Sequence, residues 1–389
     1  MRALEKNNIG MHCVLASLYF LMLPLTISVN SAGASFLKLA TIPISIFFLI
    51  SLFFYKKDLQ INIVHIVLGV YTVTTILTMF INPTSDNFEY VKGYFLNTAL
   101  FICLSVVDYN ERELKILEYV QVLLLIIITV ITLCNGGTIH DRTTLEIFGQ
   151  ESDPNYYVGF FIFPLTVTMK KIYNSKYRIF YIIAALLAIY SVFLSGSRGG
   201  LLAILVTITA FAIIYPKKTM NKFMILICML LSVLLLWFVI KPFLSDTVID
   251  RMSIEAVVET GGTHRTEIWA SMLDKIKNSS WEFILGRGVG ALHPMMVAGK
   301  VQLVVAHNHL IQVLYDQGIV GVIAFVLLIF CCFVRCMKKR KCVAIALCGV
   351  LALSLSLSFN PSIKSFWNLI PYAAFCFPKS HIDYTKDTD

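Results

Sequence analysis

The stretch that decides how this chain folds is "YSVFLSGSRGGLLAILV", residues 190–206. Two apolar runs flank the hexapeptide Ser195-Gly196-Ser197-Arg198-Gly199-Gly200, and each continues into a segment long enough to cross a bilayer, about 20 residues. A charge at bilayer depth is costly and is usually kept for a functional reason. We therefore expect two membrane helices joined by a turn in which the arginine has a task.

The composition supports a membrane protein throughout. Of the 389 residues, 58% are hydrophobic and only 14% are charged, and the mean hydropathy is +0.78, whereas a soluble domain has about 25% charged residues. We interpret residues 1–389 as a single integral membrane domain. The net charge of +9 lies mostly in short loops, where it controls topology, so we expect no nucleic acid partner.

Apolar stretches predict an all-α, polytopic protein of about twelve transmembrane helices. The predicted spans are 11–30, 35–55, 61–81, 90–107, 115–134, 156–170, 178–195, 200–215, 222–240, 309–334, 342–359 and 364–378. One set of loops, including both termini, carries 20 Lys and Arg residues, and the alternating short loops carry five. The positive-inside rule then predicts that both termini are cytoplasmic and that the long segment 241–308 is external.

The external segment 241–308 is the one large element outside the predicted spans. Within it, "THRTEIWASMLDKIKNSS" places Ile268, Met272, Leu273 and Ile276 on one face, which predicts a short amphipathic helix. The ten cysteines include no CxxC pair, and no histidine accompanies their cluster at 331–342. Buried thiols in membrane helices therefore explain them better than a metal site.

The first candidate site is the turn around Arg198. Gly199 and Gly200 can leave backbone N–H groups free at the start of the next helix, and a helix N-terminus beside an arginine binds anions well. Ser197 belongs to the same small-residue turn. The alternative is a tight helix hairpin whose arginine snorkels to the interface.

Three further candidates lie on the predicted outer side. His307 and Asn308 open a helix, where a neutral imidazole can accept a proton; the alternative is a capping Asn beside a solvated His. Asp153-Pro154-Asn155 suits a helix start, which is its simpler explanation, and Arg142 lies in the same loop. Arg265 is a second anion ligand or a solvated surface charge.

Together these pieces resemble the O-antigen ligase/polymerase family of bacterial envelope enzymes. The matching elements are the DPN helix start at 153–155, SGSRGG at 195–200, Arg265 with Trp269, GRGVG at 286–290, and a His-Asn-led helix at 307–321. In the last motif Ile311 stands where Leu is usual. The resemblance covers about 140–321, and the N-terminal 130 residues carry topology only.

The resemblance implies a metal-independent, cofactor-free, inverting glycosyltransferase of the bacterial cytoplasmic (inner) membrane, with helices arranged as in GT-C enzymes. Its donor is a glycan on undecaprenyl diphosphate at the outer leaflet. Its acceptor is another lipid-linked repeat unit, in an O-antigen, capsule or exopolysaccharide polymerase, or lipid A-core, in a ligase. We expect the polymerase, with the ligase as the alternative, and a flippase and a chain-length regulator as possible partners.

The residue roles also follow from the resemblance. Arg198 and Arg265, with Arg142, clamp the diphosphate, and His307 removes the proton from the acceptor hydroxyl. Asn308, Ser197, Asp153 and Asn155 support them. A secondary transporter is a weaker alternative, because it would place ionisable residues in mid-membrane and show internal repeats. A scaffold would leave the outer arginines and histidines unexplained.

Overall fold

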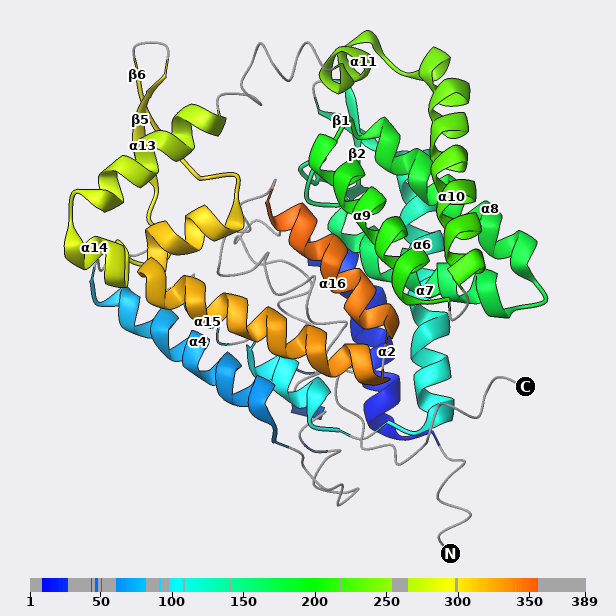
Figure 1. Cartoon of the computed structure of the whole chain (residues 1–389), viewed down its shortest axis with the longest axis horizontal. Coiled ribbons are helices and arrows are strands. Elements are labelled where there is room, and N and C mark those ends of the chain that lie inside the picture. Colours follow the sequence, from blue (N-terminus) through cyan, green and yellow to red (C-terminus); the bar gives the residue numbers. More distant parts are fainter. Residues whose placement is uncertain are drawn as a thin grey trace, which may run out of the picture.

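The computed structural model describes residues 9–26, 61–81, 98–107, 109–139, 141–216, 219–253, 265–297, 300–339 and 341–355, with a few single positions between 43 and 95. Within them the chain is mostly helical (Figure 1). Three helices are long and apolar enough to cross a membrane, within 111–135, 222–243 and 309–337, and five shorter apolar helices accompany them. The predicted spans 35–55 and 364–378 lie outside the described residues.

The apolar runs that the structure describes form helices where the sequence predicts them. The long helices are α2 (Met11–Met22), α4 (Ile63–Met79), α6 (Glu111–Asn135), α7 (Gly159–Asn174), α8 (Arg178–Leu194), α9 (Arg198–Ile214), α10 (Thr219–Ile240), α15 (His309–Lys339) and α16 (Lys341–Ser354). Their ends follow local chemistry. Asn110, for example, caps α6 by accepting a hydrogen bond from the Glu113 N–H. The Glu113 carboxylate in turn accepts a hydrogen bond from the Asn110 N–H.

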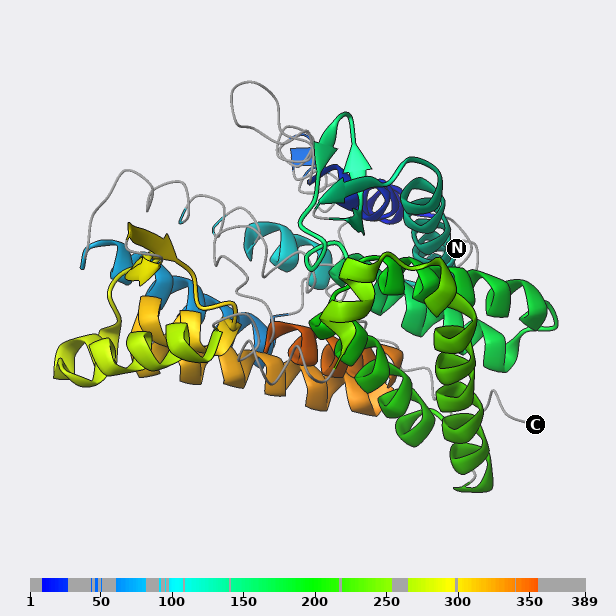
Figure 2. The same ribbon diagram turned by 90° about the horizontal axis from the view of Figure 1, so that it is seen from above.

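The helices form two neighbouring groups, and α16 joins them. On one side α15 lies along α4, and on the other α7, α8 and α9 pack together beside α6; α16 contacts both α15 and α9 (Figures 1 and 2). The close approach of α16 requires a glycine, because a Cβ at Gly349 would collide with the Thr207 hydroxyl. The α9–α16 contact therefore fixes the helix that begins at Arg198.

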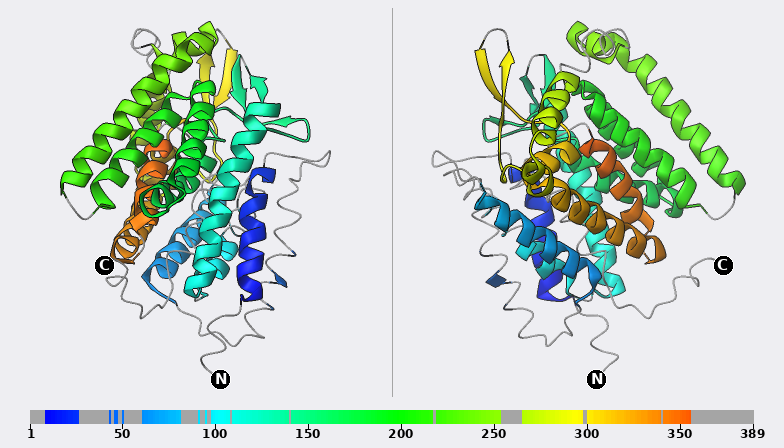
Figure 3. Two further views of the ribbon diagram at one scale, coloured as in Figure 1. Left: turned by 90° about the vertical axis from the view of Figure 1, so that its right-hand side faces the viewer. Right: turned by 60° about the vertical axis from the view of Figure 1, so that its left-hand side comes forward.

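Three short antiparallel hairpins correct the all-α expectation. They pair β1 (Gly137–Ile139) with β2 (Arg142–Thr144), β3 (Glu146–Ile147) with β4 (Gln150–Glu151), and β5 (His293–Val297) with β6 (Lys300–Val304). In the first, Ile139 pairs with Arg142, and Asp141 takes a positive φ of 58° in the turn. The strands lie at the same end of the molecule as the short helix at 246–252 (Figures 1 and 3). Such short strands give almost no alternating pattern for sequence analysis to detect.

Apart from the 3-10 turn η1 (Leu23–Thr26) after α2, the remaining elements belong to the predicted external segment. They are η2 (Lys241–Phe243), α11 (Asp246–Met252), α13 (Arg265–Lys277) and α14 (Ser280–Leu285). The predicted amphipathic helix is confirmed as α13, which buries Ile268, Met272 and Ile276 on one face. This face packs against Ala306 and Tyr315 and so attaches α13 to the start of α15.

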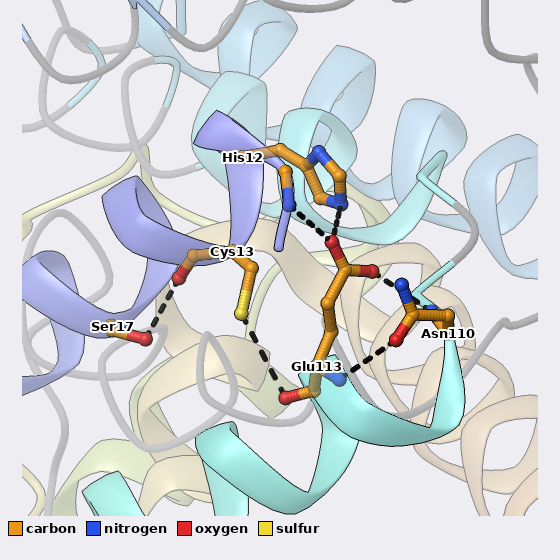
Figure 4. A network of polar contacts seen from close by, with 6 residues as sticks. His12, Cys13, Ser17, Asn110 and Glu113 are labelled. Atoms are coloured by element: carbon orange, nitrogen blue, oxygen red, sulfur yellow. Dashed lines mark hydrogen bonds and ion pairs between the residues drawn. The ribbon is translucent and has the colours of Figure 1, made fainter. Parts of the chain in front are cut away.

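Two acidic side chains of α6 hold the end of the bundle at which α2 and α6 begin. The Glu113 carboxylate lies 3.0 Å from His12 Nε2 and accepts hydrogen bonds from the Gly10 and Asn110 N–H groups (Figure 4). Further along α6, the Glu118 carboxylate pairs with Lys170 at 2.6 Å and Lys171 at 2.8 Å. These contacts join α6 to α2 and α7.

Candidate functional site

The first hairpin brings Arg142 onto the turn around Arg198. Arg142 is 7% exposed, and its Nε donates to the Ser195 carbonyl at 2.7 Å. Its Nη2 donates to Asn155 Oδ1 at 3.2 Å. Arg142 thus connects all three outer motifs that precede the long external segment, and it keeps further N–H donors beyond these two bonds.

Asn155 is the polar centre of this connection. Its Oδ1 accepts hydrogen bonds from Arg142 and, at 2.9 Å, from Ser197 Oγ. Asp153 orients it, because Asp153 Oδ1 accepts from both the backbone N–H and the side-chain amide of Asn155. The Asp153 carbonyl also accepts from the Tyr156 N–H, so the motif forms a turn before α7. The predicted helix start at this motif is wrong, because α7 begins at Gly159 with Val158 as its N-cap and no side-chain cap.

The structure corrects one expectation about the Arg198 turn. Ser197 caps α9, and its hydroxyl accepts the Gly200 N–H at 3.1 Å, so that backbone donor is already used. Anion binding here therefore depends on side chains more than on this N–H group. The Arg198 Nε–H donates to the backbone carbonyl of Arg251, which orients the guanidinium from a segment 53 residues away.

Arg251 is the residue that sequence reasoning missed. It lies in the last turn of α11, and its position in the long external segment, next to no recognisable motif, gave no signal beyond its charge. The short helix that carries it stands over the β1–β2 hairpin (Figure 1).

A frame of hydrogen bonds holds the backbone around His307. His307 has a positive φ of 49°, which is uncommon for a residue with a side chain and is typical of functional positions. The preceding Ala306 donates its N–H to Gln312 Oε1 at 2.9 Å and accepts from the Trp269 indole at 2.6 Å. Asn308 then accepts from the Leu310 and Ile311 N–H groups. The predicted capping role of Asn308 is confirmed, and Trp269 links His307 to the helix that begins at Arg265.

The GRGVG motif supports this frame by packing its backbone against α15. Gly286 and Gly318 both have positive φ, and a Cβ on either would collide with the other segment's backbone. The Arg287 N–H donates to the Tyr315 carbonyl at 2.8 Å, and the Gly288 N–H donates to the Asp316 carbonyl at 2.9 Å. The two glycine-containing motifs therefore form one interlocked unit.

Asp316 is a second residue that sequence reasoning overlooked. It is completely buried in α15. Its carboxyl oxygens accept hydrogen bonds from Gln312 Nε2 at 2.8 Å and from the Gly290 N–H at 3.3 Å. Since Gln312 also holds Ala306, Asp316 supports the His307 backbone indirectly. An acidic residue within an apolar span was the available signal.

The electrostatics bring the two halves of the site together. Burial and then the Arg251 charge lower the pKa of Arg142 to about 10. The same two causes lower the pKa of Arg265. Burial and then the Arg265 charge lower the pKa of His307, against an opposing effect of Asp153. These effects require short separations, so the site joins the motifs at 142–155 and 195–200 to those at 265 and 307.

Three arginines of the site form no ion pair with a described carboxylate. Among the described residues, no carboxylate forms an ion pair with Arg142, Arg198 or Arg251, although Asp153 is close enough to influence Arg142 and Arg265. Arg142, Arg198 and Arg251 therefore keep positive charge that no ion pair among the described residues neutralises. Such a cluster suits a ligand with more than one negative charge, and arginine forks match phosphate oxygens.

Part of this site lies in a segment that matches a known protein family. Residues 183–326 match the family model described as O-antigen ligase. Over this segment the chain is similar to the O-antigen ligase family. It contains Arg198, Arg251, Arg265 and His307, whereas Arg142, Asp153 and Asn155 precede it. The resemblance of the motifs to this family is confirmed.

One curated relative is an O-antigen ligase from Pseudomonas aeruginosa, 32% identical over 125 residues. The match covers 30% of this chain and 30% of that relative. A chain in a solved peptidoglycan synthase complex, described as coordinating polymerization and crosslinking, is 14% identical with a TM-score of 0.47. That alignment covers 80% of this chain and 94% of the other, and it carries no assignment of fold.

Proposed function

We propose that this protein transfers a glycan from an undecaprenyl diphosphate carrier to an acceptor glycan. The observation that carries the proposal is the convergence of Arg142, Arg198 and Arg265 with His307, from segments up to 165 residues apart in numbering. Arginine forks neutralise a diphosphate, and a histidine with a lowered pKa is unprotonated at neutral pH. Both are needed for this reaction.

The reaction is a single displacement at the anomeric carbon. The acceptor hydroxyl oxygen forms the new bond to this carbon, and its proton passes to the His307 imidazole. The bond between the anomeric carbon and the diphosphate oxygen breaks, and undecaprenyl diphosphate leaves with the electron pair. Attack from the opposite face inverts the anomeric configuration. The arginines stabilise the charge that develops on the departing diphosphate, without a metal ion.

Two acceptors fit the same chemistry. Lipid A-core would make the protein a ligase, and the name of its Pseudomonas aeruginosa relative supports this acceptor. A second lipid-linked repeat unit would make it a polymerase, as the sequence analysis expected. Purified protein supplied with one acceptor at a time distinguishes them, because only the polymerase produces a ladder of lipid-linked glycans.

The membrane topology belongs to the same proposal. We propose twelve spans in a GT-C-like arrangement in the bacterial inner membrane, with cytoplasmic termini and 241–308 external. Asn278, exposed after α13, and Lys176, exposed between α7 and α8, provide opposite test positions. In a background of unreactive native cysteines, an impermeant maleimide should label N278C on intact cells and K176C only after lysis. The reverse pattern contradicts the orientation.

The function is tested with His307→Ala in purified full-length protein, reconstituted in lipid with a synthetic lipid-linked donor and each acceptor. Transfer should fall by about 10²–10⁴-fold, because a positioned general base is lost. The midpoint of thermal unfolding should stay near the wild-type value. If His307→Ala transfers at nearly the wild-type rate, His307 is not the base.

His309→Gln is the matched control. His309 begins α15 two residues later, but it is 1% exposed and packs against the Phe325 ring at 4.6 Å. Its replacement should affect packing more than transfer, and folded His309→Gln protein should keep most of its activity. An inactive but folded His309→Gln variant would place the base on the wrong histidine.

A further inference from the structure

Other residues of α11, and not the Arg251 guanidinium itself, make the contacts that position Arg251. At the start of α11, Ser245 Oγ donates to the Asp141 carbonyl and Thr247 Oγ1 donates to the Asp141 carboxylate, each at 3.2 Å. The buried Val248 lies beside Gly196, whose positive φ of 56° forms the turn before Arg198. These contacts fasten α11 to the hairpin of Arg142 and to the turn of Arg198.

The last turn of α11 is connected to the same place. The Arg198 Nε–H donates to the Arg251 backbone carbonyl, so the two arginines approach through a bond that uses none of Arg251's side-chain donors. The Arg251 Nε is buried and has no hydrogen-bond partner among the described residues. A buried guanidinium donor without a partner is costly, and a ligand that accepts from it removes the cost.

The Arg251 charge also acts on its neighbours. Burial is the largest cause of the lowered pKa of Arg142 and of Arg265, and Arg251 is the next. Arg142, Arg198 and Arg265 are held close to Arg251, and these like charges repel one another. No described carboxylate forms an ion pair with Arg251. The fold keeps this repulsion in place through the contacts of α11, and an anion bound among them would relieve it.

We propose that Arg251 is a fourth ligand of the donor diphosphate, which donates to a phosphate oxygen together with Arg198. This inference rests on the proposed function and deepens it. It assigns α11 the task of placing a cation over the leaving group from a segment separate from both the Arg198 turn and the Arg265 helix.

Inorganic diphosphate is the probe, and the full-length protein in lipid is the sample. Titrated diphosphate should raise the midpoint of thermal unfolding of the wild-type protein at constant ionic strength. Arg251→Met should weaken diphosphate binding by about tenfold or more, because a charge-assisted hydrogen bond is lost. The backbone carbonyl that accepts from Arg198 remains in this variant, so its midpoint without diphosphate should be unchanged. Arg251→Lys should recover part of the affinity.

Arg287→Ala is the matched control, since Arg287 lies in the same external segment but pairs with Glu282 at 3.1 Å. It should bind diphosphate within about twofold of wild type. Diphosphate should also protect Arg251 in the wild-type protein from phenylglyoxal, as measured by mass spectrometry, so the inference does not depend on a variant that folds. Unweakened binding by Arg251→Met, or absence of protection, overturns it.

The outcomes separate this inference from the proposed function. Glycan transfer by Arg251→Met should show kcat/KM lowered by about tenfold or more. If His307→Ala retains transfer while Arg251→Met loses diphosphate, the catalytic proposal fails and the Arg251 assignment stands. If His307→Ala is inactive while Arg251→Met binds diphosphate as wild type does, only the Arg251 assignment fails.

Discussion

The charged residues near the two ends of α6 differ in whether they are paired. At its first turns, Glu113 faces His12, and Glu118 faces Lys170 and Lys171, so each carboxylate has a basic partner within 3.0 Å. Past its other end, the hairpin places Arg142 in a group of four arginines. Three of them, Arg142, Arg198 and Arg251, form no ion pair with a carboxylate among the described residues. With 25 residues, α6 separates the two ends by about 37 Å.

This difference teaches how to distinguish structural from functional charge in a membrane protein. Paired charges satisfy each other, so their loss should reduce stability while the remaining folded protein stays active. Unpaired like charges do not stabilise the fold, so their loss should reduce ligand binding and catalysis while stability is kept or increased. The following experiments examine this division from the largest expected effect to the smallest.

Glu113→Ala should have the largest effect, and it should be on stability. Removal of the carboxylate leaves the N–H groups of Gly10 and Asn110 and the ring of His12 without their acceptor. Loss of one partner of a buried pair costs about 3–5 kcal/mol. Thermal unfolding in lipid measures the loss, and activity per folded molecule should be retained. A stable but inactive variant would contradict the distinction between structural charges at one end of α6 and functional charges at the other.

Arg198→Lys should affect catalysis alone. Lysine keeps the charge but loses the fork and the Nε donor that reaches the Arg251 carbonyl. We expect kcat/KM to fall by roughly 10²-fold, as when one preorganised donor to a developing anion is removed. Steady-state transfer measures this change, with thermal unfolding as the check on folding. Normal glycan products at a normal rate would show that Arg198 only closes a helix hairpin.

Glu118→Gln should have a smaller effect on stability than Glu113→Ala. The Lys170 and Lys171 side chains remain 31% and 13% exposed, so water replaces much of the lost interaction. We expect a loss of about 1 kcal/mol, measured by thermal unfolding, and unchanged transfer. A loss as large as that of Glu113→Ala would show that exposure does not distinguish the two pairs.

The pH dependence gives the smallest but most specific signal. In the proposed mechanism transfer requires unprotonated His307, so the rate should rise with pH through a pKa below the usual 6.5. Arg265→Met removes a cation that lowers this pKa, so the acidic limb should move to higher pH. Asp153→Asn removes an anion that raises it, so the limb should move to lower pH. Rate profiles under saturating donor measure both, and shifts in the same direction would contradict the assignment of His307.

Much of this arrangement could be predicted because it depends on local sequence. Apolar runs gave the helices with ends such as Arg178–Leu194 and Arg198–Ile214 close to the predicted bounds, and the spacing of Ile268, Met272 and Ile276 gave α13. The hairpins at 137–151 were missed because strands of two or three residues carry no periodicity. Arg251 was missed because nothing in its neighbourhood distinguishes it from a surface charge. The expected free N–H of Gly200 was wrong because Ser197 caps it.

The sequence by itself determined that this is a membrane protein, where its described helices run, and which arginines and histidines stand at helix ends. It did so because burial in lipid demands long apolar runs, and caps and turns act within a few residues. Only the tertiary structure decided that Asn155 joins Arg142 to Ser197, that Trp269 holds the backbone beside His307, and that α11 adds Arg251. These contacts connect residues 13 to 53 positions apart, and their geometry depends on how whole helices pack.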